Sequence, residues 1–245
     1  MKRHVRINRF LAAAGFGSRR ACDELIRRGG VQVNGEPVVS LSTLVDPDVD
    51  TVTVDGVEVR GSEPSLLLVL NKPVGVLSTV VDTHGRRTVI DIAKDAGYEQ
   101  RLYPVGRLDL DTSGLILITN DGDLAYRLTH PRYKVEKTYE VVVRGAIDDE
   151  TVGRIAGGVD IGGYRTQPCA VRITERDPES SGVEIRIKEG RKRQIRRMFK
   201  ASGHDVLELR RTAIGGLTFD DLDKGEIRPL TDEEEKRLRV LAGLA

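Results

Sequence analysis

The sequence predicts an α+β protein in which a small helical module precedes a larger domain built on a mainly antiparallel β-sheet with flanking helices. Two observations lead to this fold class: strand-type segments follow one another along the chain, and segments with helical periodicity are few and short. In a doubly wound α/β domain the two patterns would alternate regularly. A chain of 245 residues, 39% of them hydrophobic, can supply a core for each part.

The N-terminal module is expected to contain two short helices and two hairpins. Apolar side chains recur at helical spacing from Ile7 to Ala14, and Ser18 is well placed to cap a second helix. Residues 31–39 and 50–59 then alternate around an Asn-Gly and an Asp-Gly pair, which are typical hairpin turns. The polar stretch RGSEPS, residues 60–65, is the expected linker. We therefore expect domains at residues 1–62 and 63–245.

The larger part reads mostly as strands. An apolar strand is expected to end at Lys72 and Pro73, with more strand pattern after Gly75. Residues 114–120 and 137–145 predict two further strands, and residues 124–130 fit a helix. Residues 184–204 are expected to form a strand, a basic turn and a helix, and a charged helix should lie near the C-terminus.

The net charge of +1 conceals an uneven distribution. Residues 1–28 carry eight Lys and Arg against two acids, and residues 186–211 carry ten against three. Two basic patches on a nearly neutral chain indicate a polyanionic partner, although solvated helix faces would give the same pattern.

Two further features concern the compartment and the cysteines. There is no long apolar run and no signal-peptide pattern, which predicts a cytoplasmic protein without a membrane partner. Cys22 and Cys169 lie far apart and outside metal-binding spacings, so we expect core or half-buried thiols.

The acidic turn GRLDLDTSG, residues 106–114, is the strongest candidate for chemistry. A calcium-binding loop would need a Glu at its twelfth position, where this chain has Asn120. A phosphatase of the haloacid-dehalogenase type would need an apolar strand before Asp109, whereas here the strand follows. A plain tight turn explains Asp111, Thr112 and Gly114, but not Arg107 and Asp109 beside a buried strand. An Asp held near arginines there would act as a nucleophile or a base.

Four segments together resemble a known family. Residues 106–122, with 70–79 before them and 130–141 and 189–199 after them, are similar to bacterial rRNA pseudouridine synthases of the RsuA/RluB group, most of all to its large-subunit (23S) branch. Residues 7–35 resemble the αL RNA-binding module of ribosomal protein S-four. The resemblance implies an isomerase that cleaves the N-glycosidic bond of a uridine, turns the base and rejoins it through carbon five, with no cofactor or metal.

The resemblance also implies the site residues. Asp109 would be the essential aspartate, as nucleophile or as base; Tyr139 would lie against the target base, and Arg196 would pair with Asp109, although its neighbouring arginines compete for that role. Arg107 would help displace the base. RNA contacts are expected from two groups of residues. They are Arg6, Arg9, Ser18, Arg19, Arg20, Arg27 and Arg28 in the module, and Lys72, Arg191, Lys192, Arg193 and Arg197 in the larger domain. His84, Arg86 and Arg87 could form a second contact loop or a solvated turn.

Several alternatives stay open at this stage. The target uridine could lie in 16S rather than 23S rRNA, and a non-catalytic RNA-binding protein would use the same basic patches. The expected partner is ribosomal RNA, in precursor or assembling large subunits, and the protein is expected to be a monomer.

Overall fold

The computed structural model describes residues 4–59 and 64–244, and the chain divides into two compact units. One comprises residues 1–66 and 120–122, and the other residues 67–119 and 123–245. The expected domain boundary at residues 62 and 63 lies outside the described residues. No helix in the described ranges is both long and apolar enough to cross a bilayer.

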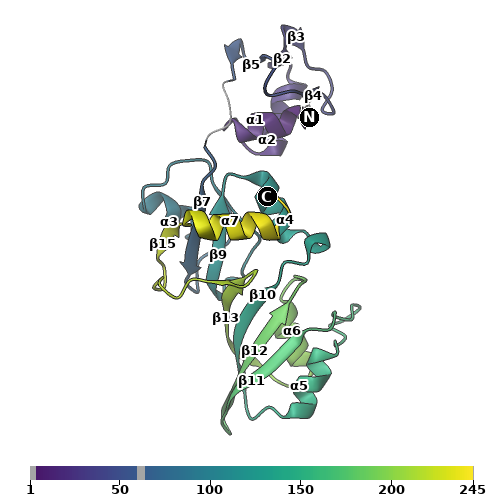
Figure 1. The fold of residues 1–245 in the computed structure, drawn as a ribbon, viewed down its shortest axis with the longest axis vertical. Coiled ribbons are helices and arrows are strands. Elements are labelled where there is room, and N and C mark those ends of the chain that lie inside the picture. Colours follow the sequence, from purple (N-terminus) through teal and green to yellow (C-terminus); the bar gives the residue numbers. More distant parts are fainter. Residues whose placement is uncertain (1–3, 60–63, 245) are drawn as a thin grey trace. The chain divides into compact units, whose positions relative to one another are not determined.

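The first unit packs two helices against short strands (Figure 1). Helices α1 (Ile7–Ala13) and α2 (Arg19–Arg27) follow β1 (Val5–Arg6), and the Ser18 hydroxyl accepts from the Ala21 amide as the expected cap. Strand β1 pairs with β4 (Leu44–Val45) in a two-stranded sheet. A second sheet has four strands in the order β3-β2-β5-β6. Its strands are β2 (Val31–Val33), β3 (Glu36–Pro37), β5 (Val52–Val54) and β6 (Val57–Glu58).

Both predicted hairpins of this unit are confirmed. Asn34 and Gly35 join β2 to β3, and Asp55 and Gly56 join β5 to β6. All four residues have φ between +50° and +85°. Such values are those of the tight turns that Asn-Gly and Asp-Gly pairs favour.

The second unit is built on one sheet with the order β11-β12-β10-β13-β9-β7-β15. Its strands are β7 (Leu67–Lys72), β8 (Tyr103–Pro104), β9 (Ser113–Thr119), β10 (Lys137–Arg144), β11 (Ala170–Arg176), β12 (Ser180–Ile187), β13 (Val206–Ile214), β14 (Leu217–Thr218) and β15 (Ile227–Pro229). Every described strand pair of this sheet is antiparallel except β9 with β13. The α+β prediction is therefore confirmed.

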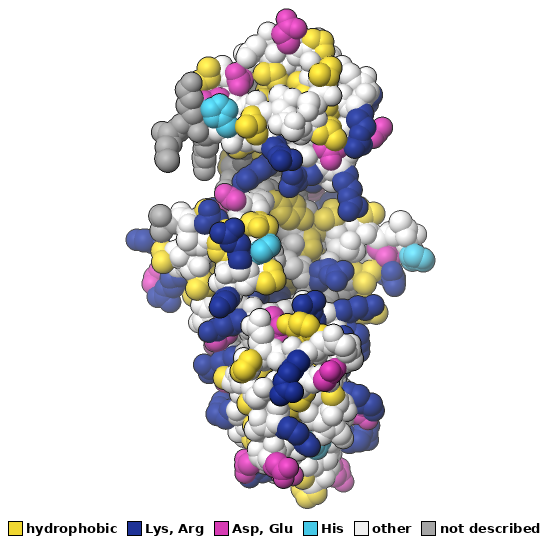
Figure 2. Space-filling view, turned by 90° about the vertical axis from the view of Figure 1, so that its right-hand side faces the viewer, with side chains coloured by type: hydrophobic (Ala, Val, Ile, Leu, Met, Phe, Trp, Pro, Cys, Tyr) yellow, Lys and Arg dark blue, Asp and Glu magenta, His cyan; other side chains and the backbone are white. Residues whose placement is uncertain are grey.

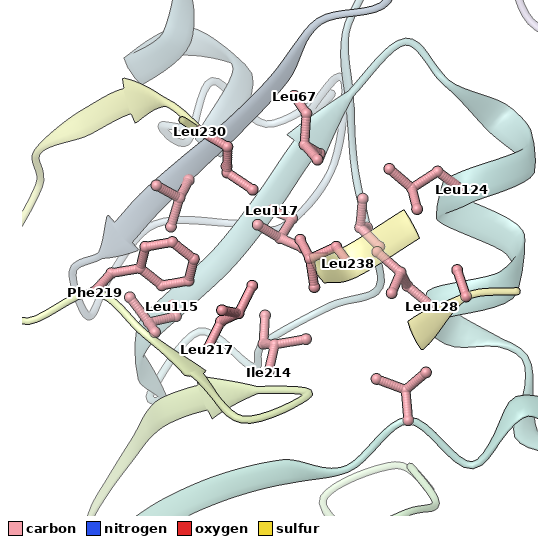
Figure 3. Close-up of a cluster of buried hydrophobic side chains, with 14 of the residues drawn as sticks. Leu67, Leu115, Leu117, Leu124, Leu128, Ile214, Leu217, Phe219, Leu230 and Leu238 are labelled. Carbon is pink, nitrogen blue, oxygen red and sulfur yellow. The ribbon is translucent and has the colours of Figure 1, made fainter. Parts of the chain in front are cut away.

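The helices divide this sheet into two halves with separate cores. Helices α4 (Gly122–Thr129) and α7 (Asp232–Leu241) cover β7 and β9, and Leu238 of α7 packs among leucines of β9 and α4 (Figure 3). Helices α5 (Asp149–Ala156) and α6 (Gln194–Ala201) pack on β10 and β12. Helix α3 (Val89–Asp95) and the 3-10 helix η1 (Pro131–Tyr133) complete the unit.

One expected strand is absent. After β7 the chain turns at Gly75, and within residues 73–88 only the bridge between Leu77 and Thr88 has strand pairing. In place of a neighbouring strand, the Gly75 amide donates to the Leu110 carbonyl of the acidic turn over 2.9 Å, and Leu77 bonds to the backbone of Arg87 and Val89.

The two halves of the sheet join at Gly114. This residue pairs with Lys72 of β7 on one side and, in parallel, with Arg211 of β13 on the other. Its φ is +100°, and a Cβ there would overlap the Arg211 carbonyl and lie 2.7 Å from the Arg211 nitrogen. Only glycine combines this φ with so close an approach of two backbones.

We predict that Gly114→Ala strongly destabilises the protein. The matched control is Gly145→Ala, because Gly145 has φ +79° but no atom within 4 Å of an added Cβ. The control should lower the free energy of unfolding by about 1–2 kcal/mol through backbone strain alone. Gly114→Ala should cost about 1–3 kcal/mol more, because of the overlap. Urea denaturation of both variants measures the difference, and equal losses would contradict the close approach.

Candidate active site

The acidic turn is held in place by backbone contacts. Residues 105–112 link β8 to β9, which are themselves antiparallel neighbours. The Thr112 amide donates to the Asp109 carbonyl over 3.1 Å, and Leu108 is buried. Gly106 has φ +77°, which favours glycine at this position. The turn thus exposes Arg107 and leaves Asp109 half-buried.

A cavity of about 270 Å³ opens beside this turn. Tyr139 of β10 lines it together with the turn, and the loop between β12 and α6 supplies basic side chains. Its lining residues are Gly106, Arg107, Leu108, Asp109, Thr112, Tyr139, Ile187, Gly190, Arg191, Lys192, Arg193, Gln194, Ile195 and Leu209. The structure therefore brings together Asp109, Tyr139, Arg107 and three of the expected RNA-contacting residues.

The two aspartates of the turn have different surroundings. Asp111 does not line the cavity; the Arg193 guanidinium donates to both its carboxylate oxygens, over 3.0 and 2.9 Å. This hydrogen bonding holds the pKa of the Asp111 carboxyl below its usual value. The Asp109 side chain lines the cavity and, within the described parts of the chain, makes no hydrogen bond or ion pair.

Arg196 differs from its predicted role. We expected it to pair with Asp109, but its Nε lies 3.2 Å from an Asp111 carboxylate oxygen, and its NH2 group donates to the Asp111 carbonyl over 2.7 Å. Arg193, directly before α6, and Arg196 are three residues apart, so both reach the outer residue of the turn. The Asp111 side chain therefore also joins the turn to α6.

Lys72 also differs from its predicted role. It was expected to contact RNA, yet it has no exposed surface, and its ammonium group donates to the carbonyls of Pro73 and Val76 over 2.8 Å each. An ammonium group in this position cannot reach a phosphate. Burial lowers the pKa of Lys72 to about 8, and the nearby Asp111 and Asp109 charges oppose that shift.

The basic loop before α6 has a buried frame that we did not foresee. The Glu189 carboxylate accepts from the Gln194 amide group, the Gln167 backbone amide and the Tyr164 hydroxyl, over 2.6 to 3.0 Å. Arg191 lies over the Tyr164 ring, 4.0 Å from its centroid. A single acid within the basic run EGRKRQIRR was the available sequence signal. This frame presents Arg191 and Lys192 to the cavity.

The remaining predicted contacts are exposed. Arg197 lies outside the cavity, in a neighbouring one of about 510 Å³ that also contains Arg196. His84, Arg86 and Arg87 are exposed too, with Arg86 paired to Asp82 and Arg87 to Asp95. On the face shown in Figure 2, Lys and Arg side chains are spread over the larger unit among fewer acids.

The predicted contacts of the first unit are all exposed as well: Arg6, Arg9, Ser18, Arg19, Arg20, Arg27 and Arg28. Arg27 pairs with Glu24 and Arg28 with Asp55, over 3.2 and 2.6 Å. Surface pairs of this kind are weak, so both guanidinium groups remain available to a polyanion.

Among the residues that the structure describes, no cluster of three or more His, Cys, Asp or Glu side chains is arranged to hold a metal ion. Within the described residues, the ion-pair partners of Asp111 are Arg193 and Arg196.

Known proteins are similar to this chain over almost its whole length. Residues 66–201 match the family model described as RNA pseudouridylate synthase, and residues 5–50 match the S4 domain. The chain is 42% identical to ribosomal large subunit pseudouridine synthase B of Bacillus subtilis, over 97% of this chain and 96% of that protein. It is 41% identical to an uncharacterized RNA pseudouridine synthase of Aquifex aeolicus, over 98% of this chain and 96% of that protein. A crystal structure of a pseudouridylate synthase, 31% identical, superimposes with a TM-score of 0.67 over 96% of this chain and 99% of that one.

We predict that the buried Lys72 makes stability depend on pH in the alkaline range. The folded amine loses its proton near pH 8, whereas the ordinary amine does so near 10.5, so between these values the unfolded chain binds more protons. Through this group the free energy of unfolding therefore increases as the pH rises from about 8 to 10.5, by up to about 1.4 kcal/mol per pH unit.

Comparison of the parent with Lys72→Met isolates the pH-dependent increase in unfolding free energy that Lys72 causes. The variant should be less stable throughout, because two buried carbonyls lose their donor. The difference in unfolding free energy between parent and variant, measured by urea denaturation across that range, should widen as pH rises. A difference that stays constant would contradict the lowered pKa.

Proposed function

Because this chain belongs to the RNA pseudouridylate synthase family, we propose that it converts one uridine of large-subunit ribosomal RNA to pseudouridine. As a member of this family it is an isomerase. The observation that carries the proposal is the cavity of about 270 Å³ that Asp109 lines together with Tyr139 and the basic loop before α6. Support for the large-subunit RNA comes from the name of the Bacillus subtilis relative. Small-subunit RNA is the alternative.

In this proposal Asp109 acts at the ribose. The bond between the anomeric carbon and N1 of uracil breaks, the base turns, and a bond from the same carbon to C5 forms; the C5 proton leaves and N1 gains one, so no group enters or is lost. The Asp109 side chain is suited to this because no partner within the described residues occupies its oxygens. It would act either as nucleophile at the anomeric carbon or as base at the neighbouring carbon.

Tyr139 would contact the extruded base, and Arg107 would fill the space that the base leaves in the RNA. Tyr139 is half-buried in the cavity wall, where its ring can stack on an extruded uracil, a contact worth ~1–3 kcal/mol. Arg107 is exposed at the turn and can fill the gap in the RNA stack. The exposed Arg191 and Lys192 lie where phosphates flanking the target can be bound.

Reaching a stacked base requires additional binding energy. Flipping a nucleotide costs a few kcal/mol, which contacts away from the reacting atoms must offset. The exposed arginines of the N-terminal module are suited to that purpose. We propose that the module binds the RNA backbone and that the larger unit carries the chemistry.

We predict that Asp109→Asn abolishes turnover and leaves RNA affinity and stability intact. Loss of the reacting carboxylate should lower kcat by on the order of a thousandfold or more. The matched control is Asp111→Asn, two residues away, which removes the charge that pairs with the half-exposed Arg193 and the mostly buried Arg196 but keeps an oxygen that can accept from both. A pair as exposed as that of Asp111 with Arg193 contributes about 0–1 kcal/mol to stability, so this variant should keep most of its activity.

The measurements are release of tritium from C5-labelled uridine in rRNA, filter binding and thermal unfolding. If Asp109→Asn formed pseudouridine as fast as the parent, the proposed chemistry would be wrong, and a non-catalytic RNA-binding role would account for the basic surfaces.

We predict that a strain lacking the gene loses a pseudouridine from its large-subunit rRNA. Mapping of pseudouridines in both rRNAs should reveal the loss, and expression of the parent protein should restore it where Asp109→Asn does not. Loss from the small-subunit rRNA instead would establish the alternative target, and loss from neither RNA would contradict an rRNA substrate.

A further inference from the structure

Asp109 has to be positioned by its backbone. Its side chain lacks a partner within the described residues, so no side-chain contact aims it into the cavity. Productive chemistry requires the reacting groups to be held to within a fraction of an ångström. What holds the peptide groups on either side of Asp109 therefore determines where the carboxylate lies.

The peptide groups before Asp109 are both held by the hydroxyl of Ser78. This Oγ accepts from the Leu108 amide over 3.1 Å and donates to the Leu108 carbonyl over 3.0 Å. The first of these groups belongs to the peptide bond between Arg107 and Leu108, and the second to the bond between Leu108 and Asp109. Ser78 is 7% exposed and Leu108 is 6% exposed, so water does not compete freely for these hydrogen bonds.

Ser78 is itself firmly anchored. The preceding residue, Leu77, donates its amide to the Arg87 carbonyl over 3.0 Å and accepts from the Val89 amide over 2.9 Å. Val89 begins α3, whose start is closed by reciprocal bonds between Thr88 and Asp91. A continuous chain of contacts therefore leads from a capped helix with one buried face through Ser78 to the backbone of Asp109.

We propose that Ser78 is a positioning residue for the reaction: its hydroxyl fixes the backbone that aims Asp109 at the ribose. This inference rests on the proposed function, since it assumes that Asp109 reacts. Ser78 touches neither the cavity nor, in the proposed reaction, the substrate. Its removal should therefore affect the rate of the chemical step and not the binding of RNA.

The chain offers a closely matched control in Ser181. Its buried hydroxyl also bridges two backbone groups, accepting from the Ile147 amide and donating to the Gly145 carbonyl, each over 3.0 Å. Ser181 pairs with Val143, four residues along β10 from Tyr139, and does not line the cavity. Ser78→Ala and Ser181→Ala thus lose the same kind of hydrogen bonds, but only Ser78 is bonded to the backbone next to Asp109.

The first test compares single-turnover rates at saturating rRNA. Ser78→Ala should lower the rate on the order of tenfold to a hundredfold with RNA affinity unchanged, as small displacements of a reacting group do. Ser181→Ala should unfold at a similarly lowered temperature yet keep the parental rate, and Ser78→Thr, which retains the hydroxyl, should recover most of the loss. Equal rates in Ser78→Ala and parent, equal loss in Ser181→Ala, or a loss confined to RNA affinity would each overturn the proposal.

The second test needs no substrate. Amide hydrogen exchange at Leu108 should become several-fold faster in Ser78→Ala and remain parental in Ser181→Ala. Unchanged protection of Leu108 would overturn the proposal even if the protein acted on another substrate. A parent protein that formed no pseudouridine would contradict the proposed function, while the exchange measurement would still decide whether Ser78 holds this backbone.

Discussion

The close pairing of β9 with β13 is the constraint on which the rest of the catalytic unit depends. Lys72, Gly114, Arg211 and Tyr139 lie side by side on four neighbouring strands, in one row across the sheet. Because Gly114 has no side chain, β13 can approach β9 in parallel and join the two halves of the sheet. Gly114 is the last residue of the acidic turn, and Tyr139 is in the same row. A wider separation at Gly114 would move Tyr139 away from Asp109.

This junction explains why the cavity lies between two hydrophobic cores. The turn belongs to the half that contains β7, β9, α4 and α7, whereas Tyr139 and α6 belong to the half packed around β10 and β12. The two halves are joined again by the pairing of Asp111 with Arg193 and Arg196, whose side chains start from residues more than eighty positions away. Close-packed cores deform little, so each half can hold its site residues rigidly.

The charges of the site follow from the same geometry. Asp111 is paired with Arg196 of α6 and with Arg193, the residue directly before that helix. Asp109 is therefore the aspartate of the turn that lines the cavity and has no partner among the described residues. Two further cations lie buried near the junction: Lys72, whose charge interacts with both aspartates, and Arg211, which donates to the Leu115 carbonyl over 2.6 Å. The arginines beside Asp111 favour the ionised form of its carboxyl group, whose pKa lies below the usual value.

The sequence by itself determined the local structure, because hairpin turns, helix caps and alternating strands depend on neighbouring residues. The Asn-Gly and Asp-Gly turns, the Ser18 cap, the antiparallel character of the sheet and the segments of the family resemblance could all be recognised this way. Only the tertiary structure decided which aspartate pairs with Arg196, that Lys72 is buried, that Gly75 binds the acidic turn, and that Ser78 holds Leu108. These features depend on contacts between segments thirty or more residues apart, and no local periodicity or propensity specifies such contacts.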